Sequence, residues 1–245
     1  MTNQVAQKFL AEFIGTFAFV FIGAGTAAVI GSGAGLSGIA AVAFAHGLTI
    51  MVFIFAYGSL SGGHFNPAVT VGVLAAGAIT LAEAIGYIVS QMFGGILGAL
   101  VLRAVLGGAA TGLGTPELAH GLSLGATSVT ITAANGFVIE AVLAFFLVTA
   151  VLSTAIAGRA GALAPIAIGM TVTLNILMGG PLTGAPFNPA RALGPMIATD
   201  NLGDAWLYVI APLVGACIAA FVHTALSRLG ESGLSPARAP VKPAE

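Results

Sequence analysis

Charged residues are scarce in this sequence of 245 residues, which contains only 7 Lys or Arg and 8 Asp or Glu. About a quarter of the residues are charged in a typical soluble globular domain, so an ordinary soluble protein is excluded. The single cysteine, Cys217, excludes an internal disulfide and a metal site built from several thiolates. The net charge of −1 gives no reason to expect nucleic acid as a partner.

Motifs that would indicate an enzyme are also missing. The sequence has no HExxH zinc motif and no Walker-type loop for nucleotide phosphates. We therefore expect no catalytic residue, no cofactor and no bound metal.

Apolar residues are abundant instead, at 58% of the chain, and no charged residue stands between Glu12 and Glu83. A water-exposed surface made from such a stretch would aggregate. About 20 apolar residues are needed to cross a bilayer core about 30 Å thick. Six segments meet this requirement: residues 10–31, 38–59, 84–106, 137–157, 162–180 and 205–227. The sequence therefore predicts an all-α membrane protein with six transmembrane helices.

Two shorter apolar stretches, residues 67–78 and 189–199, remain outside these spans. At about 1.5 Å per residue, helices of this length reach only about half of the bilayer core. We predict two re-entrant half-helices. The polar stretch 107–134 is expected to be a long external loop, and residues 231–245 a flexible tail after a single transmembrane domain over residues 1–230.

The basic residues predict the orientation. Six spans put both termini on the same side of the membrane. A cytoplasmic location for the termini places five basic residues inside, as the positive-inside rule requires; they are Lys8, Arg159, Arg228, Arg238 and Lys242. We therefore expect a protein of the inner cell membrane with cytoplasmic termini.

An internal repeat relates the two halves of the chain. The tripeptide Asn66-Pro67-Ala68 recurs as Asn188-Pro189-Ala190, and the preceding residues recur with it, such as Phe65 and Phe187. Each copy, about residues 8–106 and 135–228, contains three spans. An odd number of spans forces the copies into opposite orientations, so the half-helices are predicted to enter from opposite faces and meet near the midplane.

The Asn-Pro pair predicts where each half-helix begins. Asn caps free backbone N–H groups, and Pro suits the first helical position. Two facing helix N-termini each carry about +0.5 charge, so at about 4 Å and a dielectric of about 20 they repel a monovalent cation by about 4 kcal/mol. The irregular stretches before them, residues 59–65 and 179–187, offer carbonyl groups to a file of small molecules, and the Asn66 and Asn188 amides can donate to the central one.

The segments 61–70 and 184–191 resemble the paired signatures of the aquaporin, or major intrinsic protein, family. This resemblance covers about residues 8–228. It implies an aquaporin-like fold and a passive homotetrameric channel with one pore per subunit, lined in part by Phe65 and Phe187. It also implies that Asn66 and Asn188 reorient a central water and interrupt proton conduction.

Arg191 is the candidate for a charged barrier. It lies in the first turn of the second half-helix, where the helix dipole disfavours a cation, about 4.5 Å from Asn188. A snorkelling role is the alternative. The family resemblance adds His46, Ile176 and Ala185 to the filter. This set is similar to that of plant tonoplast intrinsic proteins, which implies water and ammonia, and in some members hydrogen peroxide or urea, as permeants.

The remaining histidines and the intramembrane carboxylates have two interpretations each. His64 lines the vestibule or packs in the core, and His120 in the external loop reaches the filter or stays apart from it. Glu12 and Glu140 could form a proton relay. The resemblance favours a structural role, in which both accept hydrogen bonds from the re-entrant loops.

Two other transport functions remain open. A glycerol facilitator is disfavoured by Ala192, where that branch typically has Asp, but Val209 stands where water-selective members usually have an aromatic residue. A secondary transporter also uses inverted repeats and broken helices. It would need a substrate or ion-coupling site, and no unassigned intramembrane charge remains to build one.

Overall fold

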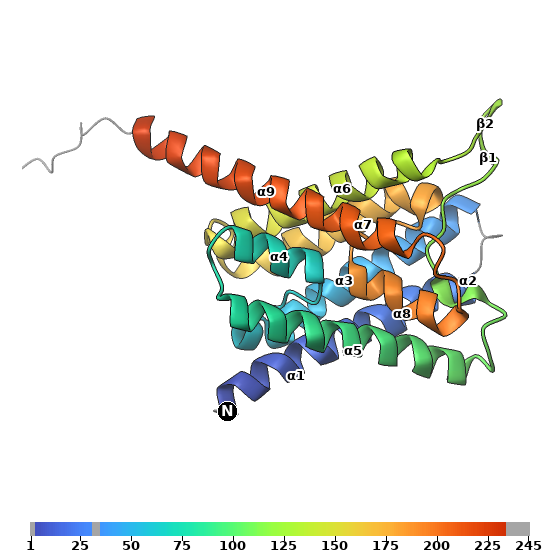
Figure 1. Cartoon of the computed structure of the whole chain (residues 1–245), viewed down its shortest axis with the longest axis horizontal. Coiled ribbons are helices and arrows are strands. Elements are labelled where there is room, and N and C mark those ends of the chain that lie inside the picture. Colours follow the sequence, from blue (N-terminus) through green and yellow to red (C-terminus); the bar gives the residue numbers. More distant parts are fainter. Residues whose placement is uncertain (1–2, 31–34, 234–245) are drawn as a thin grey trace, which may run out of the picture.

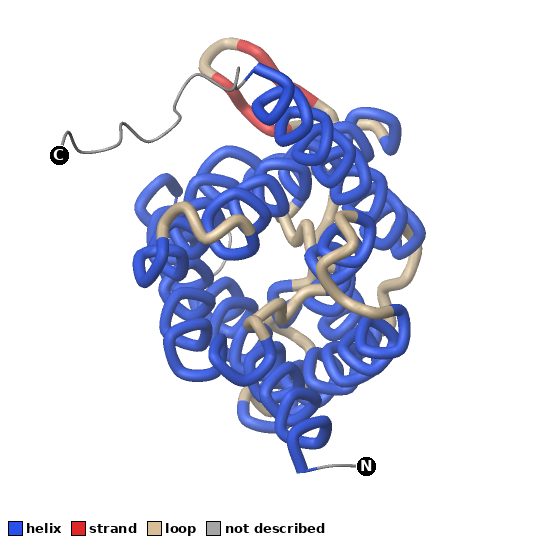
Figure 2. The backbone as a smooth tube through the Cα atoms, turned by 90° about the vertical axis from the view of Figure 1, so that its left-hand side faces the viewer, coloured by secondary structure: helices blue, strands red, loops and turns tan. Residues whose placement is uncertain are grey.

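A computed structural model describes residues 3–30 and 35–233. Long helices run roughly side by side, and two short helices lie between them (Figure 1). Seen from one end, the helices form a ring and loop segments run into its middle (Figure 2). We call the end that carries Asn3 and the start of α5 the terminus side, and the end that carries the strands the hairpin side.

The long helices supply six segments, among the described residues, that are long and apolar enough to cross a membrane. The first consists of α1 (Asn3–Ala18), the π-helical turn η1 (Phe19–Ala24) and α2 (Gly25–Ile30). The others are α3 (Gly35–Ser61), α5 (Leu81–Val105), α6 (Ala133–Ala150) with the π-helical turn η4 (Val151–Ile156), α7 (Ala164–Thr183) and α9 (Ala205–Gly233). The prediction of six transmembrane helices is confirmed.

The short helices α4 (Pro67–Ala75) and α8 (Pro189–Thr199) begin directly after Asn66 and Asn188, as predicted. Both Asn residues are extended, and each side chain accepts a hydrogen bond from the backbone of its own helix. Helix α4 ends earlier than the predicted residue 78. Its C-terminal turn closes with Gly77 in the left-handed region (φ 75°), which glycine adopts without steric cost.

Several helix ends differ from the predicted spans because local caps decide them. Thr80 and Glu83 form a capping box, so α5 begins at Leu81. Helix α7 extends to Thr183, although the backbone from residue 179 onward was predicted to be irregular. Glycine 184 then terminates α7 in the left-handed conformation, which leaves only a short irregular stretch before Asn188.

The connection at the hairpin side is more ordered than the loop predicted for residues 107–134. It contains the 3-10 turn η3 (Gly112–Gly114) and an antiparallel hairpin of β1 (Leu122–Leu124) and β2 (Thr127–Val129). On the terminus side, the turn η5 (Gly161–Leu163) precedes α7. Helix α9 extends to Gly233, so the expected tail begins inside it, and residues 234–245 lie outside the described residues.

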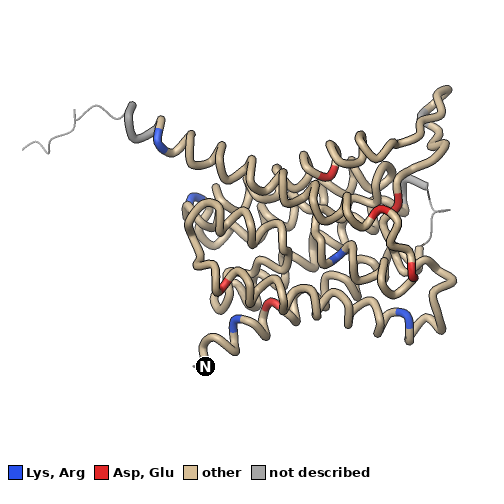
Figure 3. The backbone as a smooth tube through the Cα atoms, viewed as in Figure 1, with Lys and Arg blue, Asp and Glu red and all other residues tan. Residues whose placement is uncertain are grey.

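Small residues allow the long helices to approach closely. A Cβ atom added to Gly98 on α5 would lie 2.8 Å from the carbonyl oxygen of Phe17 on α1, a separation that requires a backbone shift. Gly94 and Gly98 therefore allow the backbones of α1 and α5 to pack closely. Charged residues are few along the middle of the bundle and more frequent near its ends (Figure 3); at the terminus side Lys8 and Glu83 form an ion pair of 2.7 Å.

Candidate functional site

The two half-helices are joined through their capping asparagines. Asn66 Oδ1 accepts a hydrogen bond from the Ala68 amide (2.8 Å), and its Nδ2 donates to the carbonyl oxygen of Phe187 (3.1 Å). In the other direction, Asn188 Nδ2 donates to the carbonyl oxygen of Phe65 (2.9 Å). Each cap therefore holds the loop of the opposite repeat. Since an amide nitrogen carries two protons, one N–H of each Asn is left for a molecule between them.

The residues before the two asparagines have unusual backbones. Phe65 and Phe187 have φ angles of 48° and 31°, in the left-handed region, which is rarely adopted by bulky residues and is costly. Both amides are held by buried carboxylates: Phe65 N donates to Glu12 Oε2 and Phe187 N donates to Glu140 Oε2, each at 2.7 Å. These bonds hold in place the two residues whose carbonyls accept from the asparagines.

Glu12 accepts more hydrogen bonds than Glu140 does. It is fully buried, and its two oxygens accept four hydrogen bonds. Oε1 accepts from the Ser61 hydroxyl (2.6 Å) and the His64 amide (2.9 Å), and Oε2 accepts from the Phe65 amide (2.7 Å) and Gln91 Nε2 (2.7 Å). Four elements, α1, α3, α5 and the first re-entrant loop, therefore meet at one side chain.

Glu140 has a smaller set of partners. It accepts from the Thr183 hydroxyl (2.6 Å) and from the Phe187 amide (2.7 Å). Pro186 occupies the place that His64 has in the first repeat, two residues before Asn, and proline has no N–H to donate. The two repeats thus use the same anchor with different numbers of donors.

Two tyrosines that sequence reasoning missed complete the anchors. The Tyr87 hydroxyl donates to the carbonyl oxygen of Ser61 (2.8 Å), and the Tyr208 hydroxyl donates to that of Thr183 (2.9 Å). Both tyrosines are buried. Their place in two apolar spans of the inverted repeat was an available signal, because a buried Tyr hydroxyl usually has a partner.

A narrow cavity surrounds the Asn pair. Its volume is about 10 Å³, close to the space that a single water molecule requires. Its walls are mainly apolar, and its lining residues are Phe19, Ile50, Gly63, His64, Asn66, Val69, Leu147, Val151, Ile168, Val172, Phe187 and Asn188. His64 both lines this cavity and is packed, since its ring contacts Tyr87 edge-on (5.2 Å) and its Nδ1 lies 3.1 Å from Thr70 Oγ1.

Arg191 lies beside His46 toward the hairpin side. Its Nε donates to His46 Nε2 (3.3 Å) and its Nη1 donates to the carbonyl oxygen of Gly114 in η3 (2.8 Å). His46 Nδ1 lies 2.8 Å from the carbonyl oxygen of Val42. Because a carbonyl can only accept, Nδ1 carries the proton and Nε2 is the acceptor for Arg191. Arg191 is buried, so it is held within the protein rather than extended to the membrane surface.

The other two predicted filter residues are also buried. Ile176 on α7 and Ala185 in the second re-entrant loop belong to the main hydrophobic cluster. Ala185 has a φ of 43°, and its amide donates to the Thr183 hydroxyl (3.1 Å).

His120 lies in a pocket whose lining residues do not include Arg191. It is exposed and lines a pocket of about 150 Å³ on the hairpin side together with Glu117, Asn201 and Asp204. Among the described residues, the side-chain hydrogen bonds of Arg191 reach His46 and Gly114. The interpretation that His120 reaches the filter stays a prediction, and the loop partner of Arg191 is the Gly114 carbonyl. No sequence signal could have found it, because every residue has a backbone carbonyl.

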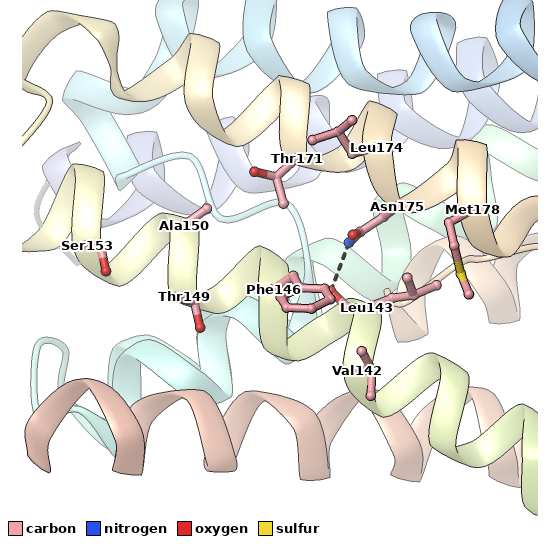
Figure 4. Close-up of a pocket in the computed structure, with 10 residues that line it drawn as sticks. All are labelled: Val142, Leu143, Phe146, Thr149, Ala150, Ser153, Thr171, Leu174, Asn175 and Met178. Carbon is pink, nitrogen blue, oxygen red and sulfur yellow. Dashed lines mark hydrogen bonds between the residues drawn. The ribbon is translucent and has the colours of Figure 1, made fainter. Parts of the chain in front are cut away.

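A larger cavity of about 560 Å³ lies on the outer face, between α6 and α7 (Figure 4). Asn175 Nδ2 donates to the carbonyl oxygen of Leu143 at its side (2.8 Å). The Thr149 hydroxyl is buried here and has no partner within the described residues. Apolar side chains supply most of its walls, including Val142, Phe146, Leu174 and Met178. This cavity shares no lining residue with the one around the asparagines.

In the part of the chain that the structure describes, six membrane-length helices and two half-helices whose caps meet inside the bundle define a multi-pass membrane protein with a central constriction. The family model described as "Major intrinsic protein" matches residues 1–223. The chain is 40% identical over 228 residues to aquaporin TIP1-2 of Zea mays, with 90% of this chain and 85% of that protein covered. It is 39% identical over 225 residues to aquaporin TIP2-3 of Arabidopsis thaliana, with 89% and 86% covered.

The fold has a solved counterpart as well. The structure of an aquaglyceroporin from Plasmodium falciparum superposes with a TM-score of 0.76 at 22% identity, covering 94% of this chain and 100% of that one. The chain belongs to the major intrinsic protein family, and the predicted family resemblance is confirmed. It is an integral membrane channel of the aquaporin type. Membership in a family of channels overturns the alternative of a secondary transporter.

Proposed function

We propose that the protein is a passive channel for water and small neutral solutes, with ammonia, hydrogen peroxide and urea as the candidate solutes, and that it excludes ions and protons. The observation that carries this proposal is the pair of crossed asparagines in a cavity of one-water size. A molecule between Asn66 and Asn188 meets one free N–H donor from each repeat. A water held there accepts twice through its oxygen, so its own protons point along the file in both directions and cannot relay a proton through the centre.

The proposed ion barrier has two parts. The N-termini of α4 and α8 each contribute about half a positive charge, and the caps hold them face to face. Arg191 adds a full charge toward the hairpin side, in a buried position fixed by two hydrogen bonds. A neutral solute is repelled by neither source of positive charge, whereas a cation is repelled by one and then by the other.

The proposed solute range rests on the character of the filter. Ile176 offers no hydrogen-bond donor and no aromatic ring, while His46 uses both ring nitrogens for protein partners. The filter wall therefore selects solutes mainly by their size and their charge. The TIP aquaporins to which the chain is similar support the same proposal.

Purified protein in liposomes is expected to accelerate osmotic shrinkage with a low activation energy, and Ile176→His is expected to lower the ammonia-to-water permeability ratio. The added histidine narrows the filter and introduces a polar group, so it hinders ammonia more than water. Stopped-flow assays of water, ammonia and glycerol on both proteins measure these effects. Wild-type protein that is folded but leaves shrinkage at the rate of empty liposomes would refute the proposal, and rapid glycerol flux would favour the facilitator alternative.

We also propose that the termini lie in the cytoplasm. Copies of the chain are further proposed to form a homotetramer through the cavity between α6 and α7. Its exposed Phe146, Leu174 and Met178 (Figure 4) suit a facing apolar helix, and Phe44 and Val52 on α3 are also exposed. Pairing of two different faces gives a ring when the rotation between successive copies closes. Thr149→Trp should fill the cavity and reduce the mass of the native complex in detergent. An unchanged tetramer would place the interface elsewhere.

A further inference from the structure

The first transmembrane segment is interrupted by a π-helical turn at the level of the filter. This turn, η1, covers Phe19–Ala24 between α1 and α2. Such turns are rare and occur often at functional sites. Two residues of the turn, Phe19 and Gly23, face His46 on α3.

Phe19 contacts the edge of the imidazole. The two ring centroids are 5.2 Å apart and the planes are inclined by 85°, a favourable edge-to-face arrangement. Phe19 also lines the cavity around the asparagines. It therefore connects the wall of the central cavity with the filter.

Gly23 supports the face of the same ring because it has no side chain. A Cβ atom added to Gly23 would lie 2.5 Å from His46 Nε2 and 2.7 Å from Cγ. Carbon atoms in van der Waals contact are about 3.5–4.0 Å apart, so any side chain at this position must displace the imidazole by about 1 Å. The ring cannot simply turn in place, since its Nδ1 is bonded to the Val42 carbonyl and its edge meets Phe19.

We propose that the π-helical turn of the first span is a positioning element of the filter, in which Gly23 and Phe19 hold His46 where its Nε2 receives Arg191. Gly23 and Phe19 are thus specificity-determining residues that act through His46. This inference rests on the proposed channel function. A displaced imidazole either enters the bore or breaks the hydrogen bond with Arg191 Nε, which frees a donor for passing solutes. Both results change the permeability to ammonia relative to water.

Gly23→Ala is expected to change the ammonia-to-water permeability ratio by at least about fivefold, which corresponds to about 1 kcal/mol of barrier difference. Gly25→Ala is the matched control, two positions along the same span. A Cβ atom at Gly25 would lie 3.2 Å from a side-chain atom of Leu102, and this side chain can move slightly to make room. The ammonia-to-water permeability ratio of Gly25→Ala should therefore equal that of the wild type. The ratio is measured by stopped flow in liposomes containing equal amounts of folded protein.

A double variant shows whether Gly23 acts through the imidazole. In a His46→Ala background, Gly23→Ala should produce no further change of the ratio, because the ring that the added methyl group displaces is absent. If Gly23→Ala alone does not fold, the double variant should restore folding for the same reason. An unchanged ratio in Gly23→Ala, an additive effect in the double variant, or failed rescue of folding would each overturn the inference. Wild-type protein without water flux would instead refute the channel function itself.

Discussion

Glu12→Gln is expected to destabilise the folded protein far more than Glu140→Gln. Each oxygen of Glu12 accepts one backbone N–H, from His64 on Oε1 and from Phe65 on Oε2. A glutamine amide must turn its NH₂ group toward one of these, and a backbone N–H cannot reverse its direction. Whichever way the amide lies, one buried donor is left opposite another donor, at a cost of about 1–3 kcal/mol.

Glu140 avoids this conflict because only one of its oxygens holds a backbone amide, that of Phe187. The other oxygen accepts from the Thr183 hydroxyl, which can rotate and accept a hydrogen bond from the new NH₂ group. The carbonyl oxygen of a glutamine at position 140 can therefore keep the Phe187 amide. The same substitution is predicted to lower the stability by different amounts in the two corresponding spans, because Pro186 stands where the first repeat has His64.

Thermal unfolding in detergent, together with the yield of monodisperse protein, measures this difference. Glu83→Gln is the control, since Glu83 pairs with Lys8 near the surface and exposed ion pairs contribute about 0–1 kcal/mol. The surviving Glu12→Gln protein should still exclude protons. Equal stability of the two glutamine variants would contradict the anchor assignment, and normal stability of Glu12→Gln with a proton leak would revive the relay hypothesis.

The features that the sequence predicts well are local ones. The half-helices start at Asn66 and Asn188 because Asn-Pro is a self-contained signal: the cap and the first helical residue are adjacent in the chain. The six spans follow from apolar length alone. Helix α7 extends past its predicted end because it accommodates Pro181 within the helix and reaches Gly184, whose left-handed conformation ends it.

Features that depend on distant partners are not encoded in any local pattern. Arg191 could be singled out as a charge in an unfavourable place, but one of its two side-chain partners, the Gly114 carbonyl, belongs to a loop whose turn η3 had no recognisable signal. His46 entered the expected filter only through family resemblance. The π-helical turn beside His46 could not be predicted, because a π-helical turn in a membrane span needs only apolar residues, as does the α-helix on either side of it.

Arg191→Ala is expected to raise cation permeability roughly thirtyfold, because two unit charges at a separation of about 8 Å and a dielectric of about 20 repel by about 2 kcal/mol. Water flux should change little, since the file and the crossed asparagines stay in place. The exclusion of cations should be lost only in part, because the half-helix dipoles remain. Asn188 still caps α8 by accepting hydrogen bonds from the amides of residues 190 and 191.

Conductance across planar bilayers, compared with water flux in liposomes, measures the two effects separately. Arg103→Ala is the matched control, because Arg103 also lies toward the hairpin side, where it donates to the Ala198 carbonyl (2.8 Å), but it stands outside the proposed pore. A barrier built by Arg191 predicts cation leakage in Arg191→Ala alone. If neither variant leaks, the facing N-termini of α4 and α8 suffice to exclude cations, and Arg191 serves instead to hold η3 and His46 together through its two hydrogen bonds.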